Sequence, residues 1–396
     1  NCASVIKDGK AFEYAINSPL ASYEGLTVVA GFPKNIVTPP SLQKRISRII
    51  SENWGYFMPI FVLMFLLYQW HTKGRDPKIT KTAIMPIYTP PDNLTPAEVG
   101  TIIDEHVDVR DISGEIIALA VRGYMKIVEN VDKGFFGQNK TYKFVLLKKD
   151  FENDEKLQHH EKKILRAIFK SASERKLLDL NNEFYKNLEP IRDSIYNLLV
   201  MKKYFPIRPD KVKKTYSFIG IGIISFSVFG IIYLNETFPP HFLFGLIISG
   251  ALFVIFAKFM PVRTKIGVGV RNKILGLEEY IRTAEKDRLK FQEKENIFEK
   301  LLPYAIVLGI ADKWSKAFEG IYKTPPSWYQ SNDPAFLNSF TTFYFLDSLN
   351  RLSSNMNSAF QSSPRSSASG LIGFGSGFGG GGFSGGGFGG GGGSAW

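Results

Sequence analysis

Three long apolar stretches dominate the pattern of hydrophobic and polar positions along the chain: residues 54–70, 218–234 and 242–257. None of them contains Asp, Glu, Lys or Arg. A membrane-spanning helix needs roughly 17–25 predominantly apolar residues, so each stretch has about the length of one crossing. Buried core helices are the alternative, but they would not explain three uncharged stretches in one chain. The pattern therefore predicts a membrane protein with three transmembrane helices.

Aromatic residues border the first stretch at both ends, where the rings of Trp and Tyr are expected to lie at the two membrane surfaces. These residues are Trp54, Tyr56, Tyr68 and Trp70. Small residues in the other two stretches would let helix backbones approach closely, and such packing drives helix association in lipid. They are Gly220, Gly222, Gly245 and Ser249, and we expect them to join the second and third helices. The alternative is that glycine is simply common in transmembrane helices.

The distribution of Lys and Arg predicts the orientation. Basic residues cluster before the second stretch, at 202–214, and after the third, at 258–273, whereas the turn at 235–241 has none. Because cytoplasmic flanks carry the excess of Lys and Arg, the turn and residues 1–53 are predicted to be extracytoplasmic. Residues 71–217 and everything after 257 are then cytoplasmic, in a multi-pass membrane protein. Three basic residues on the outer side oppose this orientation: Lys44, Arg45 and Arg48.

The amino-terminal part is interpreted as the remnant of an extracytoplasmic β domain, followed by a juxtamembrane arm. Residues 20–37 are rich in β-branched residues and end in Gly-Phe-Pro, which predicts the last strand or two of such a domain. The alternative is an irregular arm. The chain begins with Asn and shows no signal peptide, so we expect it to be a truncated sequence.

The cytoplasmic region 71–217 is predicted to contain winged-helix-like modules. In residues 92–147, Thr95 to Glu98 form a capping box, Asp111 can cap a second helix, and Gly123 can end it. A hairpin of Tyr124–Val128 and Thr141–Leu147 follows. Residues 157–205 read as a weaker second copy, with Pro190 opening its second helix.

Winged helices commonly bind DNA, so this possibility needs a charge argument. Residues 92–129 hold eight acidic and three basic residues, a local charge of −5. The helix in the recognition position carries Asp111 and Glu115, which would repel a phosphate backbone. DNA is therefore an unlikely partner, and a protein-interaction or packing module is favoured.

The remainder is predicted to be a helical unit, a linker and a tail. Residues 258–330 contain an amphipathic helix with Val270, Ile274 and Leu277 on one face, and then a second helical stretch with a kink at Pro303. Residues 331–369 read as a Ser/Asn-rich linker. Residues 370–396 hold 16 of the 36 glycines and no charge, which predicts a disordered tail. Its aromatic residues are candidate weak contacts: Phe374, Phe378, Phe383, Phe388 and Trp396.

Composition adds little chemistry to this picture. The net charge is +12, and the single cysteine, Cys2, excludes a disulfide framework and any multi-cysteine metal site in this sequence. The five histidines show no H-x-x-x-H zinc spacing, and the glycines of the tail are not followed by the Lys-Ser/Thr of a phosphate loop. We therefore predict no cofactor and no metal. No nucleophile–base pair stands out, so an enzyme is not expected.

The combination of motifs resembles a known family. The chain is similar to the YciQ-like predicted bacterial membrane proteins, domain of unknown function 2207. The features that carry this resemblance are, in chain order, a β-rich outer end reaching GLTVVAGFPKNIV, one span, AVRGYMKI, the spanning hairpin, FEKLLPYAIVLGIADKW, PPSWY and the GGGFSGGGFGGGGGSAW ending. The resemblance covers nearly the whole chain. It implies this architecture and a location in the bacterial plasma membrane. Members of the family normally have a signal peptide and a fuller outer domain, and neither is present in this sequence. The resemblance implies no reaction and no catalytic residue.

These observations lead to one expected function and two alternatives. We expect a non-enzymatic structural, scaffolding or signalling protein that links an outer domain to cytoplasmic protein partners. A membrane-anchored DNA-binding regulator is the first alternative. A component of a transport or envelope-maintenance system is the second, but a transporter would usually carry charged groups at mid-membrane, and these spans have none. The sequence identifies no small-molecule ligand.

Overall fold

The computed structural model describes residues 2–7, 11–16, 19–21, 25, 27, 29, 31, 39–78, 85–134, 137–234, 237–284 and 296–363. The chain divides into two compact units. The first unit comprises residues 1–63 and 223–250, and the second comprises residues 64–222 and 251–396. The fold is mixed α and β, as predicted.

Three helices are long and apolar enough to cross a membrane, which confirms the prediction of three such segments. They contain α2 (Met58–Lys73), α7 (Pro209–Tyr233) and α8 (Pro240–Ala257). A 3-10 turn, η1 (Trp54–Phe57), precedes α2. Helix α7 begins nine residues before the predicted stretch, because Pro209 suits the first position of a helix and a polar turn precedes the apolar part.

The first unit also contains a hairpin and a helix outside the apolar stretches. Strands β1 (Cys2–Lys7) and β2 (Ala11–Ile16) pair antiparallel. Helix α1 (Leu42–Asn53) occupies part of the predicted juxtamembrane arm, and the Ser41 side chain caps it by accepting from the Lys44 N–H at 3.4 Å. Most of the strand predicted within residues 20–37 lies outside the described residues.

The predicted helix–helix–hairpin order of residues 92–147 is present in the second unit. Helix α3 (Pro96–Asp104) begins with the capping box of Thr95 and Glu98 and follows the short turn η2 (Pro91–Asn93). Helix α4 (Val109–Val121) is capped by Asp108, not by Asp111, which takes the third helical position of a second capping box. Gly123 follows α4 with a φ of +76°, a conformation that favours glycine.

The hairpin is the centre of a four-stranded sheet with the order β5-β4-β3-β6. Strands β3 (Met125–Gly134) and β4 (Gly137–Leu146) pair antiparallel, with Met125 opposite Leu146. Strand β5 (Glu174–Lys176) pairs with β4. Strand β6 (Tyr329–Ser331) pairs parallel with β3. The rings of Trp328 and Tyr329 are buried, and their packing holds this strand on the sheet.

Residues 157–205 do not repeat the first module, which corrects that prediction. Helix α5 (His159–Phe169) and helix α6 (Tyr185–Met201) are separated by β5 and the turn η3 (Leu177–Leu180). No hairpin of their own follows, because α6 leads directly to α7. Pro190 lies inside α6 and does not open it; burial of Phe184 and Leu188 favours an earlier start of the helix.

The carboxy-terminal helices pack on these elements. Helix α9 (Lys265–Thr283) buries Val270, Ile274 and Leu277, as its pattern predicts. Helix α11 (Ile297–Val307) contains Pro303, and α12 (Ala311–Ala317) follows it. Helices α13 (Pro334–Asn338) and α14 (Thr342–Gln361) lie in the predicted linker. The linker interpretation is therefore wrong for this part, because α14 buries apolar residues at helical spacing, including Phe345, Leu349 and Leu352.

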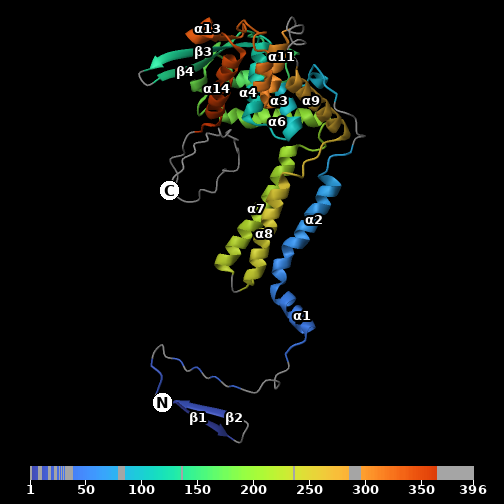
Figure 1. Ribbon diagram of the computed structural model, residues 1–396, viewed down its shortest axis with the longest axis vertical. Helices are drawn as coiled ribbons and strands as arrows, with labels where there is room; N and C mark the ends of the chain where they lie inside the picture. The colour runs from blue at the N-terminus through green and yellow to red at the C-terminus, as the bar shows by residue number, and fades with distance from the viewer. Residues whose placement is uncertain are drawn as a thin grey trace, which may run out of the picture. The chain divides into compact units, whose positions relative to one another are not determined.

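Helix α4 is at the centre of the second unit, surrounded by α3, α5, α11 and α14 (Figure 1). Its residues from Val109 to Ala120 are buried except Arg110. Asp111 and Glu115 therefore do not form an exposed acidic face. The local charge of −5 therefore does not describe an exposed surface of α4, because other helices cover this helix.

Candidate functional site

Three carboxylates with no exposed surface lie close together inside the second unit. Glu98 comes from α3, Glu115 from α4 and Glu161 from α5. Each occupies a helix face that is otherwise apolar, and ionised side chains are almost never fully buried unless they are paired. We refer to these three carboxylates and their basic partners as the buried ion-pair cluster.

Each carboxylate of the cluster has a basic partner from another part of the chain. Lys202, just after α6, donates to Glu98, and Arg122, just after α4, donates to Glu161. The Nε2 of His160 lies 3.8 Å from an oxygen of Glu115 and 3.1 Å from the Thr95 hydroxyl. Helices α3, α4, α5 and α6 are therefore joined through these pairs.

Glu115 and His160 each favour the charged form of the other. Burial acts to raise the pKa of Glu115, but the adjacent His160 and the Ala97 N–H, which donates at 2.9 Å, hold it below its ordinary value. Burial acts to lower the pKa of His160, but the charge of Glu115, with those of Glu98 and Glu161, raises it above its ordinary value. The neighbouring carboxylates thus oppose the effect of burial on the imidazole of His160.

Glu161 has a raised pKa. Burial and the charge of Glu115 raise its pKa to about 7, although Arg122 and His160 act in the opposite direction. One of its oxygens accepts from the Gln158 N–H at 2.6 Å. The cluster therefore changes its charge within the physiological pH range.

A cavity of about 450 Å³ adjoins the cluster. Thr95, Arg122 and Glu161 belong to its lining, with Lys156 and Lys300 contributing further positive charge and Tyr304 an aromatic wall. Among the residues that the structure describes, no group of three or more His, Cys, Asp or Glu side chains is placed to hold a metal ion. The chemistry that this arrangement offers is proton uptake and release within a set of paired charges.

A second site lies where the apolar helices join the folded part, at the carbonyl end of α3. Arg263, seven residues after Phe256 of α8 and only 7% exposed, donates to the carbonyl oxygens of Ile102 and Ile103 at 2.8 and 2.9 Å. It also pairs with Asp76, just after α2, at 3.0 Å and with Glu105 at 2.6 Å. We call Arg263 and its partners the membrane junction.

Lys213 of α7 completes the membrane junction. Its ammonium lies 3.1 Å from the Glu105 carbonyl oxygen and 3.5 Å from that of Asp104. The last carbonyls of a helix have no partner within the helix and carry the negative end of its dipole, so two cations stabilise this end of α3. Segments next to α2, α7 and α8 thus meet on one helix terminus.

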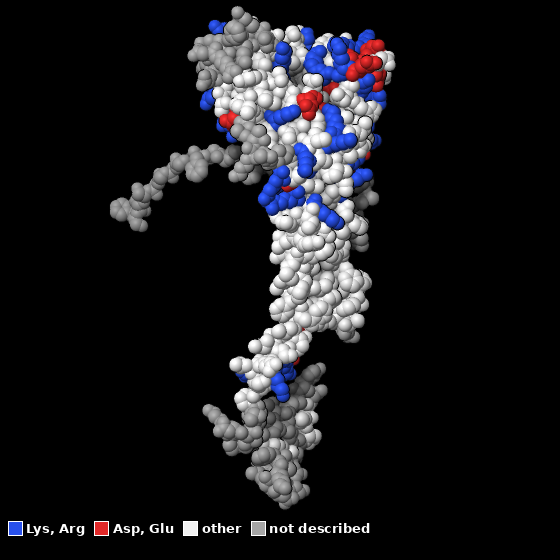
Figure 2. Space-filling view, turned by 90° about the vertical axis from the view of Figure 1, so that its right-hand side faces the viewer, with Lys and Arg blue, Asp and Glu red and all other residues white. Residues whose placement is uncertain are grey.

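Electrostatics at the membrane junction follow from burial. Burial raises the pKa of Asp104 to about 6, and it raises the pKa of Glu105 against the opposing charges of Arg263 and Lys213. On the face of the second unit drawn in Figure 2, Lys and Arg side chains gather where the apolar helices enter this unit.

A family comparison identifies the chain. The profile described as "Predicted membrane protein (DUF2207) C-terminal domain" matches residues 85–318, more than half of the 396 residues. The chain belongs to the DUF2207 family. The matched part of this DUF2207 protein holds both the buried ion-pair cluster and Arg263. Searches of the curated proteins and of the solved structures found no match to it.

The aromatic residues predicted for the membrane surfaces lie on the first helical segment of the DUF2207 protein. Trp54 and Tyr56 are in η1 and Tyr68 and Trp70 are in α2. Trp54 stacks at a tilt on Phe242, with ring centroids 5.3 Å apart, and contacts His241 at 6.4 Å. Their position at the membrane surfaces stays a prediction.

The small residues are arranged differently from the expectation. Gly245 approaches Gly55 of η1 so closely that a Cβ on Gly245 would clash with the Gly55 carbonyl oxygen. A Cβ on Gly222 would meet no atom within 4 Å, so Gly222 makes no close contact. The Ser249 hydroxyl donates to the Gly245 carbonyl within α8. In the first unit, α7 and α8 contact instead through Gly230 and Leu243. The tail aromatics, Phe374 to Trp396, lie outside the described residues.

Sequence reasoning missed the functional groups of both sites. Glu98, Glu115 and His160 stand at helical positions flanked by apolar residues, which is an available signal for buried charge. Arg263 was counted only as one of several basic residues that set orientation. Its partners Ile102, Ile103, Glu105 and Asp76 are all distant from it in sequence, and a single sequence gives no indication of that pairing.

Substitution of Gly245 by alanine should destabilise the protein by about 1–3 kcal/mol, because the added methyl group forces two backbones apart. The melting temperature of the detergent-solubilised chain measures this effect. Gly222→Ala is the matched control, since its methyl group meets open space and alanine favours a helix. Equal melting temperatures for the two variants would contradict the Gly245–Gly55 contact.

The buried ion-pair cluster should make stability fall as pH rises. The folded-state pKa values of Glu161 and His160 are raised, so their contribution is complete below the unfolded-state values and is lost as pH rises through the folded-state ones. Thermal melts at about pH 5.5 and pH 8 should therefore differ, and Glu161→Gln should reduce the difference by about 1–2 kcal/mol.

The control for this experiment is Glu152→Gln, an exposed carboxylate paired with Arg166 of α5. The pKa of Glu152 is lowered by that hydrogen bond, so its titration ends below this pH range. A pH difference that Glu152→Gln and Glu161→Gln change equally would refute the assignment to Glu161.

Proposed function

We propose that this DUF2207 protein is a non-enzymatic scaffolding or signalling protein that holds a folded body firmly at the inner surface of the bacterial plasma membrane, where protein partners bind it. The observation that supports this proposal is the membrane junction. Arg263 and Lys213 bind the carbonyl end of α3 from the segments next to α8 and α7. Asp76, next to α2, pairs with the same Arg263.

Further contacts support a stiff connection between the apolar helices and the body. Arg208, one residue before α7, pairs with Asp193 of α6 and with Asp210 at 2.8 Å. Gly267 of α9 packs directly on the backbone of Tyr204, and the Thr264 N–H donates to the Tyr204 carbonyl at 3.0 Å. A body attached in this way would move with the helices, which suits a protein that transmits position or force.

The alternatives have less support. A DNA-binding regulator would need α4 exposed, and α4 is covered by α3, α11 and α14. We infer that the winged-helix-like arrangement of α3, α4, β3 and β4 serves as a packing module. A transporter would need polar groups within the spans, and the described parts of α7 between Phe218 and Tyr233 carry only Ser225 and Ser227 as hydroxyl groups apart from Tyr233.

Proximity labelling tests the proposed location and function together. A labelling enzyme fused after Trp396 should mark cytoplasmic proteins, and the marked set should differ from that of a membrane protein of similar abundance. Arg263→Ala should reduce this specific set, because the arginine fork that holds the body would be lost. Lys273→Ala, an exposed residue of α9 paired with Asp92 at 3.8 Å, is the control.

Two results would contradict the proposal. Labelling of extracytoplasmic proteins by the carboxy-terminal fusion would refute the orientation. A set of marked proteins no different from that of the reference membrane protein, with the body folded and abundant, would refute the scaffolding role. Cysteine labelling at Lys148 and Thr237, in a chain whose native Cys2 is replaced by serine, checks the orientation independently: only Thr237→Cys should react with an impermeant reagent added outside cells.

A further inference from the structure

Helix α1 has an apolar face that no part of the described first unit covers. Four residues with at least half of their surface exposed form this face: Leu42, Ile46, Ile49 and Ile50, at 75, 57, 58 and 51%. With about 100° of rotation per residue they fall within an arc of about 100°. The opposite side carries Lys44, Arg48 and two serines, Ser47 and Ser51. The helix is therefore amphipathic, with a basic polar side.

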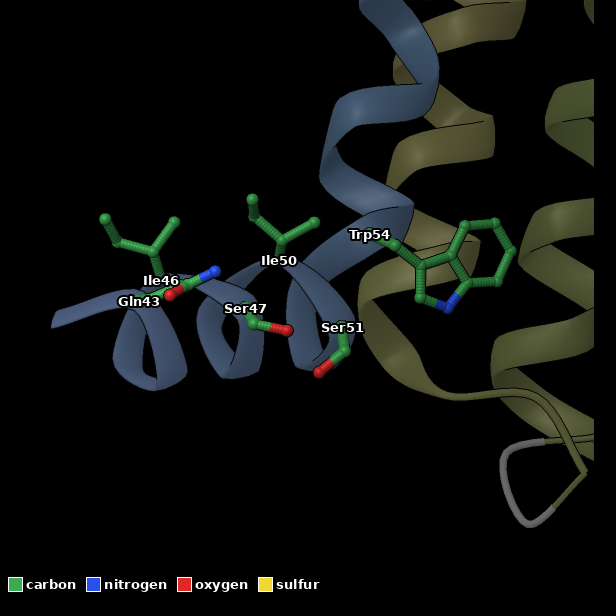
Figure 3. A pocket seen from close by; sticks show the side chains of 6 residues that line it. All are labelled: Gln43, Ile46, Ser47, Ile50, Ser51 and Trp54. Carbon is green, nitrogen blue, oxygen red and sulfur yellow. The ribbon is translucent and has the colours of Figure 1, made fainter. Parts of the chain in front are cut away.

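The apolar face of α1 lies on the same side of this helix as α2. Figure 3 shows Ile46 and Ile50 on the side of α1 toward which α2 runs, whereas Ser47 and Ser51 point the other way. These isoleucines line an open hollow of about 940 Å³ that ends at Trp54. The candidate membrane-spanning stretch runs from Leu42 to Lys73 and includes α1, η1 and α2. If the apolar helix α2 is the part that crosses the membrane, the side chains on its side of α1 face the hydrocarbon.

We propose that α1 is an interfacial helix that lies on the bilayer surface at the amino-terminal end of α2 and binds anionic phospholipid. Its apolar face is continuous with the membrane-spanning surface through η1, and Trp54 stands at the join. Lys44, Arg45 and Arg48, against Glu52 alone, give the helix the positive charge that attracts anionic head groups. Helices with this distribution of charged and apolar residues lie in the plane of the interface.

This assignment explains an anomaly in the charge pattern. Lys44, Arg45 and Arg48 oppose the orientation that the other basic residues predict when they are counted as a flank of the first span. In an interfacial helix they face the lipid head groups and the water, and Arg48 is additionally paired with Glu52 at 2.8 Å. These three residues then bind the membrane surface, and they have less influence on which side of the membrane residues 1–53 occupy.

Fluorescent probes on the two sides of α1 test the proposal in the full chain. The native Cys2 is replaced by serine, and single cysteines at Ile46 and at Lys44 carry an environment-sensitive fluorophore. The protein is reconstituted into vesicles of phosphatidylethanolamine and phosphatidylglycerol. The Ile46 probe should be quenched by lipid brominated in the acyl chain and protected from aqueous iodide about threefold or more relative to the Lys44 probe. Ile49→Cys and Ser51→Cys form a second matched pair.

Three results would overturn the proposal. Equal iodide access at Ile46 and Lys44 would mean that α1 stands in water. Protection of Ile46 without quenching by brominated lipid would mean that protein covers the face, either residues 1–41 or a second copy; dilution of the protein in lipid separates these two. Unchanged quenching when Lys44, Arg45 and Arg48 are all replaced by Gln, or when phosphatidylglycerol is omitted, would overturn the anionic-lipid part.

Discussion

The carbonyl end of α3 is the point on which the second unit of this DUF2207 protein depends. A helix terminus buried without partners would leave strong hydrogen-bond acceptors unsatisfied, at a cost of roughly 1–3 kcal/mol for each buried group. Arg263 and Lys213 satisfy four successive carbonyls, from Ile102 to Glu105. Lys213 belongs to α7, and Arg263 lies in the segment that follows α8. The hydrogen bonds that satisfy the end of α3 therefore also attach these segments to the rest of the second unit.

The buried ion-pair cluster gives the same unit a second set of long-range connections. Glu98, Glu115 and Glu161 would each be costly to bury alone, and each is paired with a group from a different helix or helix end. Removing one partner would leave an uncompensated charge, so the cluster holds the relative positions of α3 to α6. Since Glu161 titrates near neutral pH, this internal connection also responds to proton concentration.

Local patterns predicted local structure well, and long-range pairing could not be predicted. Unbroken apolar runs identified the three membrane helices, and Thr95 with Glu98 and Gly123 marked real helix ends. A composition rich in Ser and Asn made residues 331–369 read as a linker, although α14 buries Phe345 and Leu349 at helical spacing. Arg263 and Glu115 needed knowledge of partners distant in sequence, which neither periodicity nor composition supplies.

A distance measurement between two spin labels tests whether the membrane junction is stiff. The native Cys2 is replaced by serine, and single cysteines at Leu178 and Phe218 carry the labels. Both residues are exposed and both belong to the second unit. The distance between the two labels, measured in lipid nanodiscs, gives the position of α7 relative to the turn that contains Leu178. If Arg263 keeps the membrane junction stiff, the distance distribution is narrow for the otherwise unaltered chain and for Lys273→Ala. It is clearly broader for Arg263→Ala and Arg263→Lys. A distribution that is equally narrow in all four proteins would contradict it.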